Sequence, residues 1–133
     1  MKPLAIWTVG VLVAFGALTG ITVATRETER VLVVVDTSFQ MGEALGRVPA
    51  ELDRIDDRDY AEFALATVSR RSEVVHDYRA EFEWSRVEAV GPCEFDEIEM
   101  SPATSTADER ILITTSANSC SLEALEGWTI LEL

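Results

Sequence analysis

The chain has 133 residues, with 24 acidic against 11 basic side chains and a formal net charge of −13. Every acidic residue and every arginine follows residue 24, so the negative charge belongs to residues 25–133. A surface of this kind repels nucleic acid and anionic lipid headgroups, which argues against both as partners of this part of the chain. Residues 25–133 suffice for one compact domain and are too few for two.

An uncharged apolar segment, Leu4–Ala24, precedes the acidic portion and is 21 residues long. As a helix it would extend roughly 31 Å, which matches the ~30 Å hydrocarbon core of a bilayer. A cleaved signal peptide ending near Ala24 is the alternative, but the apolar cores of such peptides usually have only about 7–15 residues. We therefore predict a single-pass transmembrane anchor in residues 1–25 and one domain in residues 26–133.

The flanks of the apolar segment predict its orientation. Lys2 lies in a very short N-terminal tail, whereas Arg26 and Arg30 follow the segment among acidic residues. A short basic tail before a long apolar run is typical of a signal anchor, so we place the domain on the non-cytoplasmic (periplasmic or extracellular) side of the membrane. In an oxidising compartment Cys93 and Cys120 could form a disulfide.

Small residues in the apolar segment predict contact with another membrane helix. Gly16 and Gly20 form a GxxxG pattern, and Gly10 and Ala14 have the same spacing. Small residues four apart flatten one side of a helix and let a second helix approach closely, although glycine is also common in membrane helices without such contacts. We expect this face to bind a membrane protein partner.

The acidic portion reads as alternating strands and helices. Val31–Val35 has the pattern of a strand buried on both faces, and the apolar positions in residues 41–55 follow a 3.6-residue period. Pro49 either breaks or kinks that helix or begins a second short one. The remaining expected elements are a hairpin of Glu62–Val68 and Glu73–Tyr78, an ambiguous segment at 80–99, a loop at 100–109, a buried strand at Ile111–Ile113, a helix from Asn118 or Ser119 to Glu126, and a strand at 128–133.

This order predicts an α/β domain with a small, mostly parallel sheet and flanking helices, preceded by one transmembrane helix. In open α/β sheets, ligands gather at the carboxyl ends of the strands. The first strand brings Asp36, Ser38 and Gln40 to that edge, and the later strand brings Thr114 and Thr115.

The residues at this edge resemble those of von Willebrand factor A-type (VWA) domains. The segment VLVVVDTSFQM (31–41) is similar to the family's first strand and its D-x-S-x-S metal-binding loop, and ILITTS (111–116) stands where the family has a strand ending in T-D-G. The resemblance implies a VWA or Rossmann-like fold. The family usually has six strands and C-terminal helices that are missing here, so we expect a sheet face that a partner could cover.

In VWA domains, oxygen ligands at this edge hold Mg²⁺ or Mn²⁺. Asp36 and Ser38 match the family pattern, and Thr106 (or Thr104) could supply its threonine. Gln40 stands in place of the second serine and Thr115 in place of the later aspartate. We therefore expect no metal and no cofactor. Instead, Asp36 and Ser38 would satisfy backbone donors at the start of the following helix.

We predict a non-catalytic protein-interaction module, an accessory subunit of a membrane protein complex. The alternatives are a metal-dependent VWA-type adhesion or assembly factor of the cell envelope, and a sensor or adaptor unrelated to that family. Asp36-Thr37-Ser38 is also similar to the D-T-[GS] of aspartic proteases, but the later strand lacks the supporting glycine. A Ser–His–Asp triad would have to use His76, the only histidine, which has no nucleophile elbow nearby.

Overall fold

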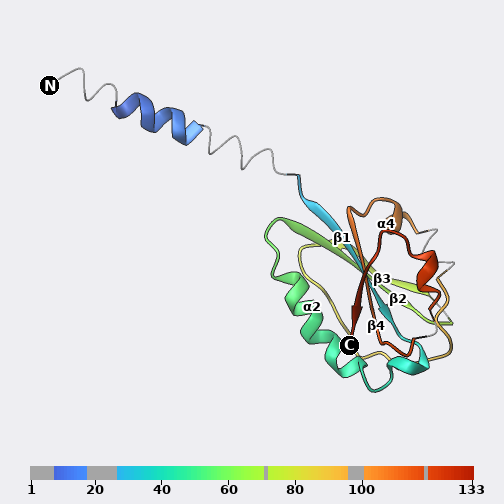
Figure 1. The fold of residues 1–133 in the computed structure, drawn as a ribbon. Coiled ribbons are helices and arrows are strands. Elements are labelled where there is room, and N and C mark those ends of the chain that lie inside the picture. Colours follow the sequence, from blue (N-terminus) through green and yellow to red (C-terminus); the bar gives the residue numbers. More distant parts are fainter. Residues whose placement is uncertain (1–7, 18–26, 71, 96–100, 119) are drawn as a thin grey trace.

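The computed structural model describes residues 8–17, 27–70, 72–95, 101–118 and 120–133 (Figure 1). Residues 8–17 are helical, and the acidic portion folds around one five-stranded sheet. Within the described residues, no helix has both the length and the apolar character needed to cross a bilayer. The other parts of the predicted membrane segment, residues 4–7 and 18–24, lie outside the described residues.

The sheet has the strand order β3-β2-β1-β4-β5. β3 is antiparallel to β2, and all other neighbours are parallel, so the predicted α/β class with a mostly parallel sheet is confirmed. This order matches the first five positions of a doubly wound sheet, in which the order of the strands reverses between β1 and β4. The strands are β1 (Glu29–Asp36), β2 (Ala61–Val68), β3 (Glu73–Arg79), β4 (Glu109–Thr114) and β5 (Thr129–Glu132).

β1 lies at the centre of the sheet because its residues are apolar on both faces. From Val31 to Asp36 every residue of β1 is buried. The parallel register places Asp36 opposite Val68 of β2, and it pairs Val35 with Ile113 of β4. Asp36 therefore ends its strand beside Thr114, at the carboxyl edge of the sheet.

One face of the sheet is covered by helical turns that follow β1. Two 3-10 helices, η1 (Phe39–Met41) and η2 (Leu45–Arg47), lead into α2 (Val48–Asp56), which has Pro49 in its first turn. Of the two expectations for Pro49, the start of a separate helix is correct, because proline lacks the N–H that a helix interior requires. Residues on this face form one cluster, including Val33, Met41, Val48, Leu52, Ile55, Phe63 and Ile113.

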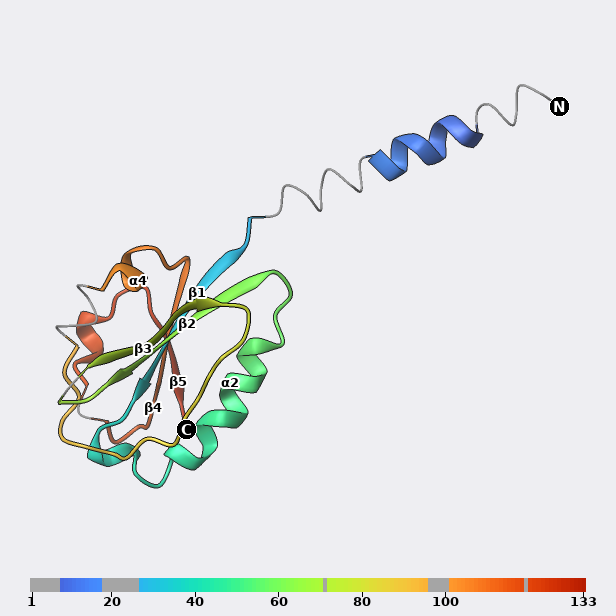
Figure 2. The same ribbon diagram turned by 180° about the vertical axis from the view of Figure 1, so that it is seen from behind.

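The segment after β3 runs alongside α2 without regular structure (Figure 2). Phe82 and Trp84 pack against the α2-side cluster, and the Phe82 ring centroid lies 4.7 Å from that of Phe63. The alternating apolar residues therefore serve to cover the sheet rather than to form a strand. Residues 96–99 of the ambiguous segment lie outside the described residues.

The other face is covered by short turns and loops. α4 (Pro102–Ser105) lies within the stretch predicted as a loop, and its first turn is capped by the Ser101 hydroxyl, which accepts a hydrogen bond from the Ala103 N–H. The buried cluster on this face includes Leu32, Val34, Ala64, Ala66, Leu112, Cys120 and Leu125. The expectation of an exposed sheet face that a partner could cover is wrong at these residues, since the chain covers them itself.

The helix predicted from Asn118 or Ser119 to Glu126 is also wrong. Only a 3-10 turn, η3 (Leu122–Ala124), forms there. The Asn118 side chain bonds the Thr115 carbonyl and the Cys120 N–H, which holds the backbone in a turn. Cys120 is in addition covalently tied to Cys93, so side-chain bonds override the local helical pattern. Ser119 lies outside the described residues.

Candidate functional site

Asp36 is the centre of a buried polar cluster at the carboxyl edge of the sheet. Its Oδ1 accepts a hydrogen bond of 2.8 Å from the Ser38 N–H, and its Oδ2 accepts one of 2.6 Å from the Thr114 hydroxyl. Asp36, Ser38 and Thr114 are all 0% exposed. A carboxyl group buried this deeply needs such donors, because burial without them costs several kcal/mol, on the order of 1–3 per lost bond. The cluster therefore joins the ends of β1 and β4.

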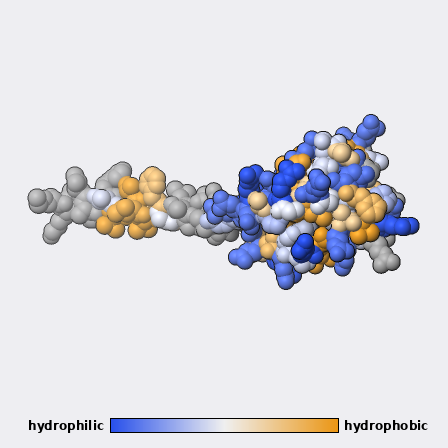
Figure 3. Space-filling view, turned by 90° about the horizontal axis from the view of Figure 1, so that it is seen from below, coloured by the Kyte–Doolittle hydropathy of each residue, from blue (hydrophilic) through white to orange (hydrophobic). Residues whose placement is uncertain are grey.

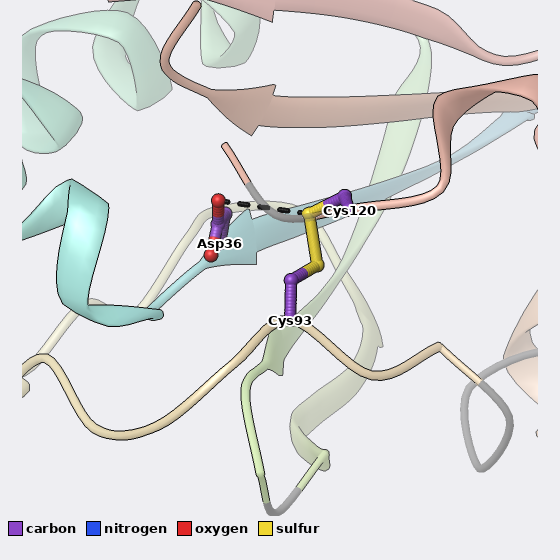
Figure 4. Close-up of side chains that lie close together, drawn as sticks. All are labelled: Asp36, Cys93 and Cys120. Atoms are coloured by element: carbon purple, nitrogen blue, oxygen red, sulfur yellow. Dashed lines mark hydrogen bonds between the residues drawn. A yellow bond between two sulfur atoms is a disulfide. The ribbon is translucent and has the colours of Figure 1, made fainter. Parts of the chain in front are cut away.

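A disulfide closes the cluster on one side. Cys93 and Cys120 are bonded, with 5.0 Å between their Cα atoms, so the predicted pairing is confirmed. Figure 4 shows the Cys120 sulfur beside the Asp36 carboxyl group, 3.6 Å from Oδ2. A disulfide sulfur carries no proton, so this is a close contact rather than a donated hydrogen bond. The disulfide links the loops around residues 91–95 and 115–121 over the end of β1.

The neighbouring hydroxyls complete a closed site. The Thr37 hydroxyl donates to the Val68 carbonyl at 3.2 Å. The Ser38 and Thr115 hydroxyls are buried and have no hydrogen-bond partner among the described residues. The cluster thus satisfies its carboxyl group internally and retains two unsatisfied hydroxyls in the interior.

The residues present do not fit a Mg²⁺ or Mn²⁺ site of the VWA type. These ions need several oxygen ligands in near-octahedral order, and the cluster offers one carboxylate. The Gln40 side chain is exposed rather than directed inward. Asp36 and Ser38 are brought together as the sequence indicated, whereas Thr106 is not.

Thr106 lies at the opposite edge of the sheet. It precedes β4, whose first residue Glu109 pairs with Val31, five residues before Asp36. At about 3.3 Å per residue this separates the two edges by roughly 17 Å. The Thr106 hydroxyl donates to the Pro102 carbonyl at 3.0 Å, which closes the last turn of α4. Thr106 and Thr104 were both candidates for the family's threonine, so the motif did not fix the position of this Ser/Thr-rich stretch.

His76 lies on β3, and both of its ring nitrogens are engaged. Nδ1 is 2.9 Å from the Asp77 carbonyl, and Nε2 accepts a bond of 3.2 Å from the Glu83 N–H. This pattern places the proton of the neutral ring on Nδ1. The imidazole therefore fastens the segment after β3 to the sheet, which leaves neither nitrogen available to activate a serine.

Two exposed apolar side chains lie near the Asp36 cluster, at the same carboxyl edge of the sheet. Phe39 is 69% exposed and Val90 is 50% exposed. Their backbones are adjacent, because the Phe39 N–H donates to the Gly91 carbonyl at 3.0 Å and the Val90 N–H donates to the Thr37 carbonyl at 2.8 Å. Figure 3, seen from this side, shows apolar patches among hydrophilic surface. We call Phe39 and Val90 the apolar edge. It was not predicted, and the one sign of it in the sequence is a phenylalanine among the polar residues after β1.

Gly91 shapes the apolar edge. Its φ of +71° lies in the left-handed region, and a Cβ at this position would meet the Arg70 Cβ at 2.7 Å. Only glycine tolerates both conditions without a shift of the backbone. The turn at Gly91 leads directly into Pro92 and Cys93, so the same residue positions Val90 at the surface and the disulfide below it.

A groove lies next to the apolar edge, between the start of α2 and residues 84–89. Its volume is about 710 Å³, and its lining includes Leu45, Pro49, Trp84, Arg86 and Glu88. The groove is open and mixed in polarity, and it contains no part of the Asp36 cluster. It extends the accessible surface along the side where the segment after β3 covers the sheet.

No protein-family model matches this sequence, and no curated protein matches it significantly.

Proposed function

We propose that this protein is a non-catalytic protein-interaction module, held at a membrane by its N-terminal helix and built on a degenerate VWA-like domain. The observation that carries the proposal is the state of the carboxyl edge of the sheet. Its carboxyl group, Asp36, is buried and internally bonded, while apolar side chains are exposed at the same edge.

The closed carboxyl edge lies where a sheet of this kind usually binds its ligands. A doubly wound sheet binds its ligands where the strand order switches, which in this chain is between the ends of β1 and β4. There the Asp36 carboxyl group bonds Ser38 and Thr114 and is covered by Cys120. A substrate has no access to these groups. The surface that remains at this edge, with exposed Phe39 and Val90, suits contact with another protein.

The VWA-like part of the proposal rests on the short motif and its placement. Asp36 and Ser38 follow a fully buried central strand, and the strand that ends in Thr114 lies directly beside it. Loss of the second carboxylate and the second serine would then have left a binding domain without its ion. Binding no longer depends on a metal in such a module.

The membrane anchor is supported by the N-terminal helix. In residues 8–17 the side chains of Val9, Leu12 and Val13 are more than half exposed, so the described part of the chain leaves these apolar residues largely uncovered. A Cβ added at Gly10 or Gly16 would meet no atom within 4 Å, which leaves that side open to a second helix. Ala14 lies in the same helix, and Gly20 lies outside the described residues. The disulfide fits a domain on the non-cytoplasmic side.

The direction of β1 places the apolar edge relative to the anchor. The anchor joins the domain just before Glu29, at the amino end of β1, whereas the apolar edge is at its carboxyl end. The proposed partner therefore contacts the domain at the end opposite the tether, while its membrane helix contacts Gly10 and Gly16. This arrangement describes an accessory subunit that binds its partner at two separated places.

The test is co-purification of the full chain with its membrane partner in mild detergent. Phe39→Asp with Val90→Asp should reduce recovery of the partner at least about tenfold, because two charges enter an apolar contact. The matched control is Val74→Asp with Val75→Asp on edge strand β3, where the exposed fractions are 40% and 39%. Normal recovery with the first pair and loss with the second would move the binding surface to β3 and contradict the proposal.

The anchor is tested separately. The full chain should stay in the membrane fraction through a carbonate wash, and Gly16→Ile with Gly20→Ile should weaken recovery of the partner through bulk alone. Release of a chain that begins near Thr25 would show a cleaved signal peptide instead. A glycine double variant that retains the partner fully would remove the helix from the interface.

A further inference from the structure

We infer that the dithiol form of this protein binds one Zn²⁺ ion through Asp36, Cys93 and Cys120, so that a metal can replace the disulfide as the link over the end of β1. The inference concerns a site and a ligand separate from the proposed docking function. It rests on three groups that converge on one point in the interior (Figure 4).

The distances among the three ligand atoms are close to those of a tetrahedral zinc site. One carboxylate oxygen and the two sulfur atoms all lie within 4.8 Å of one another. Tetrahedral zinc has Zn–S bonds of about 2.3 Å and Zn–O bonds of about 2.0 Å, which places sulfur and oxygen ligands about 3.5 Å apart. The observed separation of 3.6 Å between Cys120 Sγ and Asp36 Oδ2 already has this value. The two sulfurs must move apart, to about 3.8 Å.

The chain can supply that movement. Cys93 lies in the irregular stretch 92–95 and Cys120 lies just before η3, so neither sulfur is held by a regular element. Asp36, in contrast, is fixed at the end of β1 by the Ser38 N–H and the Thr114 hydroxyl. These bonds orient the carboxylate as outer-shell partners do in metal sites, and each oxygen keeps a second lone pair for a ligand bond.

The donor set selects the metal. Two thiolates with one carboxylate suit zinc, whereas Mg²⁺ and Mn²⁺ prefer oxygen ligands alone. In the zinc-bound form two thiolates and one carboxylate carry three negative charges, and Zn²⁺ reduces the net charge to −1. The Ser38 N–H and the Thr114 hydroxyl, which donate to Asp36, face this remaining charge. A fourth ligand can be a water molecule or a hydroxyl, and the Ser38 hydroxyl is buried without a partner among the described residues.

Reduction of the disulfide and binding of the metal are two successive steps. A dithiol reductant gives two electrons and two protons to the Cys93–Cys120 bond and becomes a cyclic disulfide, leaving two cysteine thiols. Zn²⁺ then displaces one proton from each thiol and forms two Zn–S bonds and one bond to the Asp36 carboxylate. In the reverse direction a disulfide oxidant accepts two electrons from the zinc-bound thiolates and becomes a dithiol, the Cys93–Cys120 bond forms again, and the ion is released. The metal thus links all three segments under reducing conditions, whereas under oxidising conditions the disulfide links the two that contain Cys93 and Cys120.

The experiment uses the full chain in mild detergent, reduced with a phosphine that is then removed under nitrogen, and Co²⁺ as the spectroscopic probe. We expect one Co²⁺ per reduced chain, with sulfur-to-cobalt charge-transfer absorption that one equivalent of Zn²⁺ abolishes. The oxidised chain and Cys93→Ser with Cys120→Ser should show none. Asp36→Asn should weaken binding at least about tenfold, whereas Asp53→Asn, on the exposed surface of α2, should leave it unchanged.

Reduction alone can loosen the fold, so far-ultraviolet circular dichroism accompanies each titration. If the reduced chain unfolds, Zn²⁺ must restore its secondary structure, because binding to a site of this kind is coupled to folding. Failure of the reduced chain to bind, or failure of the metal to refold it, overturns the inference. Equal affinity of Asp36→Asn and the unaltered chain also overturns it, since the site would then be two thiolates without the carboxylate.

Discussion

The two faces of the sheet are both buried, but by different means. On one face, α2 and the turns before it contribute Met41, Val48 and Leu52 at helical spacing. On the other face, the described residues include no helix longer than α4, and the loops around Cys93 and Cys120 complete the cover. The difference shows that a covalent link can replace a helix, because it removes the conformational freedom that otherwise lets loops leave the sheet.

The disulfide should be the largest single contribution to the loop-covered face. Its removal by Cys93→Ser with Cys120→Ser opens a loop of 27 residues and should cost about 3–4 kcal/mol of unfolding free energy. The measurement is urea unfolding of chains in which one tryptophan remains. Trp128 reports the loop-covered face and Trp84 the α2 face. A loss seen equally by both reporters at low urea would contradict the separation of the two faces.

Leu52 tests the α2 face in the same way. Its side chain is 2% exposed and packs in the α2-side cluster. Leu52→Ala should cost about 3 kcal/mol through lost burial and the cavity left behind. Asp53→Ala, the exposed neighbour, is the control and should stay within about 0.5 kcal/mol. If Leu52→Ala lowers the free energy of unfolding by no more than the control, about 0.5 kcal/mol, α2 contributes little to the cover of this face. The proposed difference between the two faces would then be wrong.

Thr114 tests the polar link that both faces share at the end of β1. Thr114→Val keeps the shape and removes the donor to Asp36 Oδ2, which should cost about 2 kcal/mol because the buried acceptor is left without this hydrogen bond. Thr114→Ser keeps the hydroxyl and should recover most of that loss. Thermal unfolding of the pair measures the difference, and equal destabilisation by valine and serine would assign the effect to packing alone.

Tyr78 gives the smallest effect, and it depends on pH. Its hydroxyl donates to the Ala103 carbonyl at 2.6 Å, and burial raises its pKa above the ordinary value of 10.0. The neutral phenol is thus favoured in the folded state, so its stabilisation is complete below about pH 10 and is lost as the pH rises through the raised pKa. Tyr78→Phe should cost about 1 kcal/mol at neutral pH and flatten the alkaline loss.

Tyr60 provides the control for this prediction, since its side chain is more than half exposed. Tyr60→Phe should leave the alkaline limb of the stability curve unchanged. Stability would be followed by urea unfolding at several pH values between neutral and strongly alkaline. An unchanged limb in Tyr78→Phe would mean that other groups govern the alkaline loss.

The strands and α2 could be predicted from the sequence because their signals are local. The continuous apolar run of β1 leaves no exposed side for a polar residue, and Pro49 restricts where a helix can begin. The same local signals predicted Asp36 at the end of a strand with its carboxyl group bonded to the backbone that follows, which the bond from the Ser38 N–H confirms. The same role expected for the Ser38 hydroxyl is wrong, since this hydroxyl makes no cap bond. The membrane span and the VWA resemblance remain predictions.

Contacts between distant segments were decided only by the tertiary structure. The helical pattern after Asn118 yielded to the bond between Cys93 and Cys120, and Thr106 lies at the far edge because α4 precedes β4 rather than following it. Periodicity reports which side of an element is apolar, but it carries no information on which loop will lie above another. For that reason the sequence by itself determined the sheet and its helical cover, whereas the closed Asp36 cluster and the apolar edge depended on the packing of loops separated by tens of residues.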